Sequence, residues 1–324
     1  MGLSREKARL HIKKWSETLR PYPRNANWPK YLYHAVQVET AVAILKADSL
    51  LCRNRVGRVA HDVANQGALR NNPEPHDYAR LYFRPRTQFH LKTEGIKCLD
   101  DPYRDVAHMS VPVMLAFDAE SVLSLEGTGF SVGMLSKRRD IGFDESAFEE
   151  IPFNLVYHDT IPAKEDSKRI NDHRMAEVVV PAALPLEPHL KRIICRTTLD
   201  KRTLLHLLGP DGSRFRERIV VEQVRSSIFL HKGIYLTSIN VGPKALLGFH
   251  LPSKQPASGA IEVEIAQMDG DRELVRHVYE VRSDQSDIRF GEFEPRPEAR
   301  WQVLVEKVLA FDAPVSSETS VLIP

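Results

Sequence analysis

The 324-residue sequence predicts an α+β protein, in which a mixed β core with helices is followed by a β-sandwich-like C-terminal domain. Two observations predict this division. Up to Gly209, segments with apolar residues at helical spacing alternate with short strand-like runs. After the turn signal Gly-Pro-Asp-Gly at 209–212, apolar and polar residues alternate with a period of two, as in all-β domains. We therefore expect two domains, at residues 1–209 and 210–324.

Local patterns justify each element of the first domain. Helices are expected where apolar residues recur every three or four positions, and strands where short apolar runs end at breakers. In chain order we expect a helix at 4–20, a strand at 31–36, a helix at 38–50, strands at 79–84, 111–118, 153–159, 174–181 and 190–196, and a helix at 199–208. Loops are expected at 52–77 and 124–147.

In the second domain, five segments alternate in the manner of short strands. They are RIVVEQV, GIYLTSINV, AIEVEIAQM, HVYEVR and QVLVEKVLAF, and turn signals such as MDGD and GPK separate them. This pattern predicts an accessory domain without catalytic residues of its own.

Composition narrows the class of protein. A formal net charge of +2 with 42% apolar residues is ordinary for a globular chain and indicates no particular partner. The three cysteines, Cys52, Cys98 and Cys195, are far apart, so we expect neither a disulfide framework nor a zinc site. No apolar run resembles a signal-peptide core or a membrane span. We expect a cytoplasmic protein with no metal and no membrane partner.

Six motifs carry a resemblance to a known family. In chain order they are YLYHAV, LLCRNRV, DVANQGALR, HDYARLYFRPR, RMAEVVVP and LKRIICR. Together they resemble the DarT family of nucleic-acid ADP-ribosyltransferases over roughly residues 30–208. The resemblance implies an ADP-ribosyltransferase-like mixed β core that consumes NAD. The chain departs from the family at TQFHLKTEGIK, where many members have Pro-Met-Leu, and in the short loop between Arg70 and Asp77.

The resemblance implies two catalytic residues, Arg70 and Glu177. ADP-ribose transfer breaks the nicotinamide–ribose bond through an oxocarbenium-like state, which a carboxylate near the ribose stabilises. Because a guanidinium stays charged, Arg70 is expected to polarise or position the base under attack. From the residues alone, Glu177 could instead face solvent on its strand and Arg70 could be a solvated helix-end arginine. Arg58 competes with Arg70 for the catalytic role.

Three further residues are expected to bind NAD. His34 would hydrogen-bond the nicotinamide-side ribose or amide, Asn54 the amide or pyrophosphate, and Tyr82 would stack on the nicotinamide ring. The alternatives are a filler histidine, a loop-capping amide and a core tyrosine. The sequence lacks Gly-x-Gly-x-x-Gly, so a Rossmann mode of NAD binding is not indicated.

Clustered cations indicate contacts with a nucleic-acid backbone. Alternate residues of a strand share one face, so Arg80, Arg84 and Arg86 are expected to align there. The remaining candidates are Lys137, Arg138, Arg139, Lys168, Arg169 and Arg174, in the region leading to Glu177. The alternative is an ordinary solvated surface.

These observations lead to one hypothesis and two rivals. The chain is expected to transfer ADP-ribose from NAD to a base in single-stranded nucleic acid, with DNA favoured over RNA by the family. The family also implies a toxin of a toxin–antitoxin or anti-phage system, with an antitoxin protein as partner. The rivals are a nucleic-acid-binding module on a degenerate transferase fold and an ADP-ribosyltransferase that acts on protein.

Overall fold

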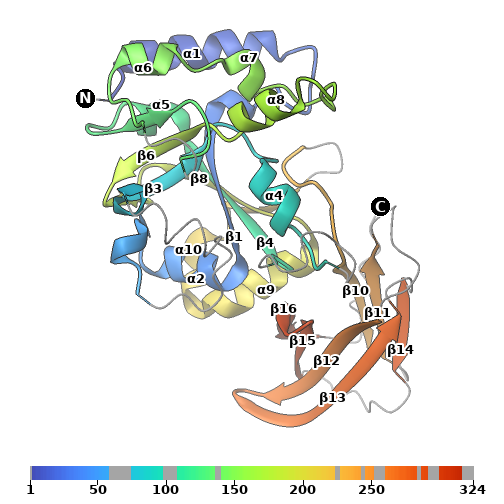
Figure 1. Cartoon of the computed structure of the whole chain (residues 1–324). Coiled ribbons are helices and arrows are strands. Elements are labelled where there is room, and N and C mark those ends of the chain that lie inside the picture. Colours follow the sequence, from blue (N-terminus) through green and yellow to red (C-terminus); the bar gives the residue numbers. More distant parts are fainter. Residues whose placement is uncertain are drawn as a thin grey trace.

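A seven-stranded sheet forms the centre of the first part of the molecule (Figure 1). The computed structural model describes residues 2–57, 74–97, 108–135, 140–222, 227–241, 245–251, 260–282, 286–290 and 299–315. The strands, in their spatial order, are β5 (Gly129–Ser131), β6 (Glu177–Pro181), β3 (Tyr78–Tyr82), β1 (Tyr31–Gln37), β4 (Pro112–Asp118), β8 (Leu190–Cys195) and β9 (Ile219–Val221). Neighbouring strands are antiparallel, except that β8 and β9 are parallel.

Helices lie above and below these strands in the view of Figure 1. They are α1 (Arg5–Thr18), α2 (Val38–Lys46), α4 (Gln88–Thr93), α5 (Ala119–Leu123), α6 (Glu145–Glu149), α7 (Phe153–Val156), α8 (Ser167–His173), α9 (Thr198–Leu208) and α10 (Gly212–Phe215). Short 3-10 helices are η1 (Trp28–Lys30), η2 (Arg53–Arg55), η3 (Glu74–Asp77) and η4 (Gly209–Asp211). Local capping explains several helix starts; the Ser4 hydroxyl, for example, accepts the Lys7 amide of α1. A two-stranded sheet pairs β2 (Ser49–Leu51) with β7 (Ala183–Pro185).

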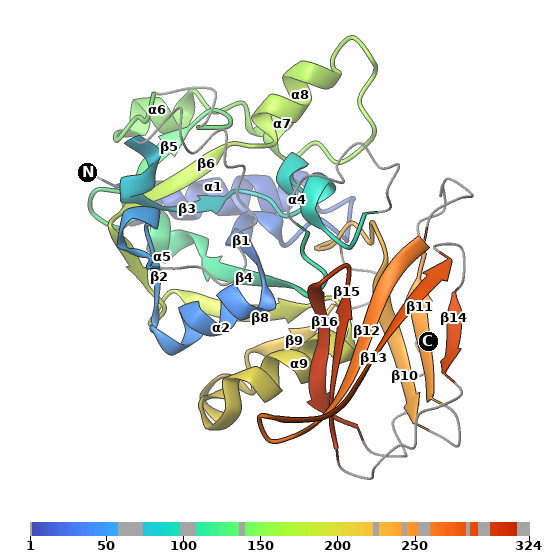
Figure 2. The ribbon, with the colours of Figure 1, turned by 60° about the horizontal axis from the view of Figure 1, so that its bottom comes forward.

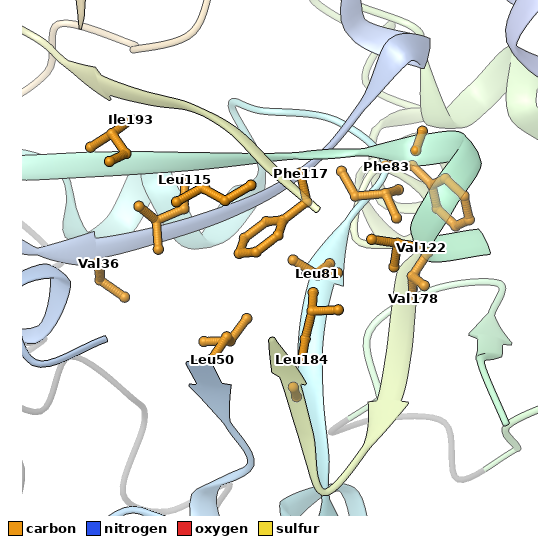
Figure 3. Close-up of a cluster of buried hydrophobic side chains, with 14 of the residues drawn as sticks. Val36, Leu50, Leu81, Phe83, Leu115, Phe117, Val122, Val178, Leu184 and Ile193 are labelled. Carbon is orange, nitrogen blue, oxygen red and sulfur yellow. The ribbon is translucent and has the colours of Figure 1, made fainter. Parts of the chain in front are cut away.

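One face of the sheet forms the main hydrophobic core, which we call the core face. Leu81, Leu115, Phe117, Val178 and Ile193 project from adjacent strands into a single buried cluster (Figure 3). Helices α1, α2, α5 and α9 supply further side chains of this cluster. The continuous apolar run of β4 is buried up to Asp118, as expected for a central strand.

The C-terminal part is a pair of packed sheets. One contains β13 (Arg272–Arg282), β12 (Ala260–Asp269), β15 (Arg300–Val305) and β16 (Val308–Pro314), and the other contains β10 (Tyr235–Val241), β11 (Ala245–His250) and β14 (Asp287–Phe290). Apolar side chains from both sheets share one cluster, so the expected sandwich-like arrangement is confirmed. Strand β16 packs against α9 of the first part of the molecule (Figure 2).

Three segments differ from the sequence prediction. Residues 153–159, expected as a strand, begin with α7 instead, because Phe153, Val156 and Tyr157 share a helical face that packs near α1. The expected loop at 124–147 contains β5 and the start of α6. After Gly209, α10 packs on α9, and β9 extends the seven-stranded sheet.

Candidate active site

Glu177 begins β6 and has no exposed surface. Its Oε2 accepts a hydrogen bond from Arg80 Nε at 2.6 Å, and its Oε1 accepts one from Arg80 Nη2 at 2.7 Å. The Leu135 backbone N–H also donates to Oε1, at 3.1 Å. This bidentate, charge-assisted pairing fixes the plane of the carboxylate. Glu177 therefore does not face solvent, the alternative that its position in an alternating strand allowed.

Strand register places Glu177 on the sheet face opposite the core. Glu177 lies opposite Tyr82, Tyr82 opposite Tyr33, Tyr33 opposite Ala116, and Ala116 opposite Arg192. Residues paired across strands project to the same side, so this row defines one face, which we call the Glu177 face. Arg80 precedes Tyr82 by two residues and shares this face, which is why its guanidinium reaches the carboxylate.

Arg80 is a partner of Glu177 rather than a free cation. Its side chain is 30% exposed, and its Nε and Nη2 both donate to the Glu177 carboxylate. Burial lowers the pKa of Arg80, but the charge and hydrogen bonds of Glu177 outweigh burial and raise it. In this structure the charge of Arg80 is paired with Glu177, and its contact with a phosphate stays a prediction.

Tyr82 is half-buried at the end of β3, in register with Glu177. Burial first, and the negative charge of Glu177 second, raise the pKa of the phenol. The hydroxyl is therefore neutral near pH 7 and able to donate a hydrogen bond. Its position beside the carboxylate is compatible with the predicted stacking on nicotinamide, which remains a prediction.

His34 bridges the point where β1 and β3 separate. These strands share one register pair, and the His34 Nδ1–H donates to the Arg80 carbonyl at 3.0 Å. Burial lowers the pKa of His34 to about 4, so the ring is neutral near pH 7. Because Nδ1 carries the proton, Nε2 is a lone-pair acceptor suited to a hydroxyl such as that of a ribose.

Asn54 lies in η2, where its Nδ2 donates to Asp77 Oδ1 at 2.6 Å. This bond ties η2 to the residue that precedes β3. The amide nitrogen is thus used within the protein, as the alternative of a loop-capping amide requires, while contact with NAD stays a prediction.

Arg84 and Arg86 do not form the expected cationic stripe. Strand β3 ends at Tyr82, and both arginines follow it in a bend. Arg84 is 1% exposed, donates to the Val156 and His158 carbonyls and to Asp159, and lies over Trp28 at 4.6 Å. Arg86 has φ 57° and donates to Asp159 at 3.2 Å. Arg84 is buried and paired with Asp159 in this structure, and its contact with a phosphate stays a prediction.

Arg174 also has a structural role that the sequence analysis missed. Its guanidinium donates to the His158 carbonyl at 2.8 Å and to the Thr160 carbonyl at 2.6 Å. Arg84 and Arg174 thus hold the segment 156–160 from two sides, and this segment leads towards Glu177. The sequence signal that could have suggested this role is Asp159, which lies two positions after the buried aromatic residue Tyr157. An acidic residue in that position is a candidate partner for arginines.

The remaining candidates divide into two groups. Lys168 and Arg169 are exposed on α8, where Arg169 pairs with Asp166 at 2.9 Å, so both stay candidates for phosphate contact. Arg70 and its competitor Arg58, with Lys137, Arg138 and Arg139, lie outside the described residues.

Metal and membrane features were also considered. Within the described ranges, no three His, Cys, Asp or Glu side chains gather in a way that would hold a metal ion. No helix in the described part of the chain has both the length and the hydropathy to cross a bilayer.

Comparison with known proteins identifies one family. The family model of "ssDNA thymidine ADP-ribosyltransferase, DarT" matches residues 33–229. No curated protein matches. Three solved structures of Thermus sp. 2.9 DarT are similar: the complex with NAD+ (17% identity, TM-score 0.47), with ADP-ribosylated ssDNA (16%, 0.48) and with carba-NAD+ (15%, 0.47). Each match covers 61% of this chain and 97% or 98% of the Thermus chain.

Proposed function

The chain belongs to the DarT family of ADP-ribosyltransferases, and from this premise we propose that it transfers ADP-ribose from NAD to thymidine in single-stranded DNA. The observation that carries the proposal is the buried Glu177 carboxylate, held by Arg80 on a sheet face that also presents Tyr82. The His34 imidazole of the neighbouring strand β1 donates to the Arg80 carbonyl and offers a free acceptor nitrogen. A degenerate binding module would have no need for a buried carboxylate held by an arginine at this position.

In the proposed reaction, the bond between nicotinamide and the ribose carbon breaks, and its electron pair leaves with neutral nicotinamide. A base nitrogen then forms a bond to the same carbon and loses its proton to solvent or to a basic group. Glu177 stabilises the positive charge that develops on the ribose, an interaction that grows as the bond lengthens. Arg80 keeps the carboxylate oriented, since two hydrogen bonds restrict its rotation.

Four further residues are assigned to the site from the resemblance to the family. His34 Nε2 would accept a ribose hydroxyl, Tyr82 would stack on nicotinamide, and Asn54 would contact the amide or pyrophosphate through its carbonyl oxygen. Arg70 is proposed as the catalytic arginine, in preference to Arg58, because it ends the segment that resembles the family's arginine motif. Side-by-side rates of Arg70→Ala and Arg58→Ala on one oligonucleotide decide between the two arginines.

We also propose a biological setting. Modification of thymidine in DNA would block copying of the strand, so the chain would act as a toxin in a toxin–antitoxin or anti-phage system in the cytoplasm. A partner protein that reverses or blocks the modification would be required. Induced expression tests this: the wild-type protein should arrest growth, and Glu177→Gln should not.

The accessory unit is proposed to begin after Glu222 rather than at residue 210, since β9 belongs to the catalytic sheet. Its role would be recruitment of substrate or of a partner. A fragment that ends at residue 209 would lack β9, so a fragment that ends near residue 229, where the family match ends, is the better test.

The central experiment is incubation of the protein with NAD and defined oligonucleotides, followed by mass measurement. The expected product is single-stranded DNA that carries one ADP-ribose. An otherwise identical oligonucleotide in which every thymidine is replaced should give no product. If only RNA were labelled, the acceptor would be RNA rather than DNA. Labelling of added protein, resistant to nuclease, would support the rival that modifies protein.

A further inference from the structure

A cavity of about 1160 Å³ opens on the Glu177 face, away from Glu177 itself. Its floor contains Tyr31 and Tyr33 of β1 and Arg192 and Ile194 of β8. Arg192 occupies the register row that runs across the sheet from Glu177. Four strand spacings of about 4.8 Å separate the two positions, so their backbones lie about 19 Å apart. A single extended ligand can therefore reach both places along one face of the sheet.

The walls of the cavity come from two segments of different origin. One wall runs from Trp15 of α1 to Trp28 of η1, and it precedes residue 33, where the family match begins. The other wall is Tyr157–Thr160, the segment that Arg84 and Arg174 fix on the way to Glu177. The cavity thus joins an element outside the family match to the segment that leads to the catalytic carboxylate.

The lining combines aromatic rings with unpaired cations. Tyr22 is 60% exposed, and the guanidinium of Arg192 lies 5.8 Å from the centre of the Tyr31 ring. Arg24 and Arg192 are exposed, and neither has a carboxylate partner among the described residues. Aromatic faces beside free cations are the combination that binds unpaired nucleotides, because bases stack and phosphates pair.

The acidic residues of the lining do not cancel these cations. Asp159 already pairs with Arg84 and Arg86, at 2.7 and 3.2 Å. Glu222 accepts backbone N–H groups of Ile228 and Phe229 and contacts His231. Both carboxylates are thus engaged within the protein, and Arg24 and Arg192 are the charged side chains available to a ligand.

Two buried polar atoms in the lining have no partner among the described residues. Asn25 is 6% exposed, and its Oδ1 accepts no hydrogen bond; Trp28 is 1% exposed, and its Nε1–H donates none. Buried polar atoms of this kind are generally satisfied in the working protein by water or ligand. Their position in the lining indicates that a polar ligand could bind in this cavity.

We propose that this cavity binds unpaired nucleotides of the single-stranded DNA that flank the base modified at Glu177. The inference rests on the proposed function, because it assigns the acceptor strand to this cavity. A separation of about 19 Å corresponds to about six stacked nucleotides at 3.4 Å each. Long oligonucleotides would therefore contact both Glu177 and the cavity, whereas a tetranucleotide would contact Glu177 alone.

The test uses the full-length protein and the double variant Arg24→Glu/Arg192→Glu. The charge control is Arg216→Glu, at an exposed arginine that caps the C-terminus of α10 and does not line the cavity. Binding of a fluorescein-labelled 16-mer of deoxythymidine is measured by anisotropy across a salt series, without NAD. Transfer rates are measured for the 16-mer and for a tetramer, together with the KM for NAD. Tyr22→Ala, at an exposed ring, tests stacking separately.

The double variant should bind the 16-mer at least tenfold more weakly, and the slope of log affinity against log salt should fall by about 1.4. Tyr22→Ala should weaken binding about threefold or more, while the tetramer and the KM for NAD should not change. Unchanged 16-mer binding, or equal losses in the Arg216→Glu control, would overturn the proposal. A raised KM for NAD with unchanged DNA binding would assign the cavity to the adenosine of NAD instead. If the wild type binds the 16-mer but labels nothing, the proposed function fails while the binding result still decides this site.

Discussion

The two faces of the seven-stranded sheet are built from alternate residues of the same strands, yet they do different work. On the core face, Leu81 and Val178 are fully buried in apolar contacts. On the Glu177 face, their neighbours Arg80 and Glu177 form a bidentate ion pair. The core face contributes apolar burial, whereas Arg80 and Glu177 hold buried charge on the opposite face at a cost in desolvation. Changes at Arg80 and Glu177 should therefore alter the reaction, and changes on the core face should alter stability.

The largest expected effect on the rate of ADP-ribose transfer comes from Glu177→Gln, on the Glu177 face. The amide keeps the shape of the side chain but lacks the charge that stabilises the ribose cation. We expect transfer to fall about 10²–10³-fold, the usual loss for one electrostatic group aimed at a transition state. Single-turnover transfer to a thymidine oligonucleotide measures it, and near-wild-type turnover by a folded variant would remove Glu177 from the mechanism.

A smaller loss is expected for Arg80, which acts on Glu177 and is a positioning residue. Arg80→Ala should lower kcat about 10- to 100-fold with little change in the KM for DNA, because orientation of the carboxylate is lost. Arg80→Lys should recover part of the rate, since it restores the charge but not the bidentate geometry. If Arg80→Ala mainly raised the KM for DNA, Arg80 would be a phosphate contact after all.

The pH dependence of stability offers a third test. Burial lowers the pKa of His34 to about 4 and that of His90 to about 3. In the unfolded chain both rings have an ordinary pKa near 6.5. Between the folded and the unfolded pKa values the unfolded chain therefore binds more protons than the folded one. The free energy of unfolding consequently falls as the pH drops below about 6.5. The slope is up to about 1.4 kcal/mol per pH unit for each histidine. Denaturant unfolding at pH 7, 6 and 5 measures it, and His34→Gln should flatten the curve by about one proton. A curve that His34→Gln leaves unchanged would mean that this ring is not buried neutral.

The smallest effect on the reaction is expected on the core face. Leu115→Ala removes a fully buried side chain from β4 and should destabilise the protein by about 2–5 kcal/mol. The rate of transfer per folded molecule should stay within about twofold. Thermal melting and active-site titration separate the two quantities. A large loss of rate in the folded variant would show that the two faces are not independent.

Much of the fold followed from local pattern. β1, β4, β8 and α9 lie where apolar runs and breakers predict them, because each contributes apolar residues to the core-face cluster. The α7 prediction failed because Phe153, Leu155, Val156 and Tyr157 fit both a strand and a helical turn, and packing against α1 decides between them.

The site was less predictable than the fold. Glu177 was found through a motif, but its partner was assigned to DNA, because Arg80 and Glu177 are 97 residues apart in sequence. Sequence alone does not show that β3 and β6 are neighbours, and without that register the charge of Arg80 looks free. Arg84 was assigned to DNA for the same reason, because its partners at 156–159 belong to a segment that is distant in sequence.

A double-mutant cycle on Arg80 and Glu177 tests the central claim most directly. The rates of residual transfer would be compared for the wild type, Arg80→Ala, Glu177→Gln and the double variant, all checked for folding. If Arg80 acts only by positioning the carboxylate, the double variant should have the rate of Glu177→Gln alone, because the two losses share one cause. Losses that multiply in the double variant would contradict the account and would give Arg80 a role of its own.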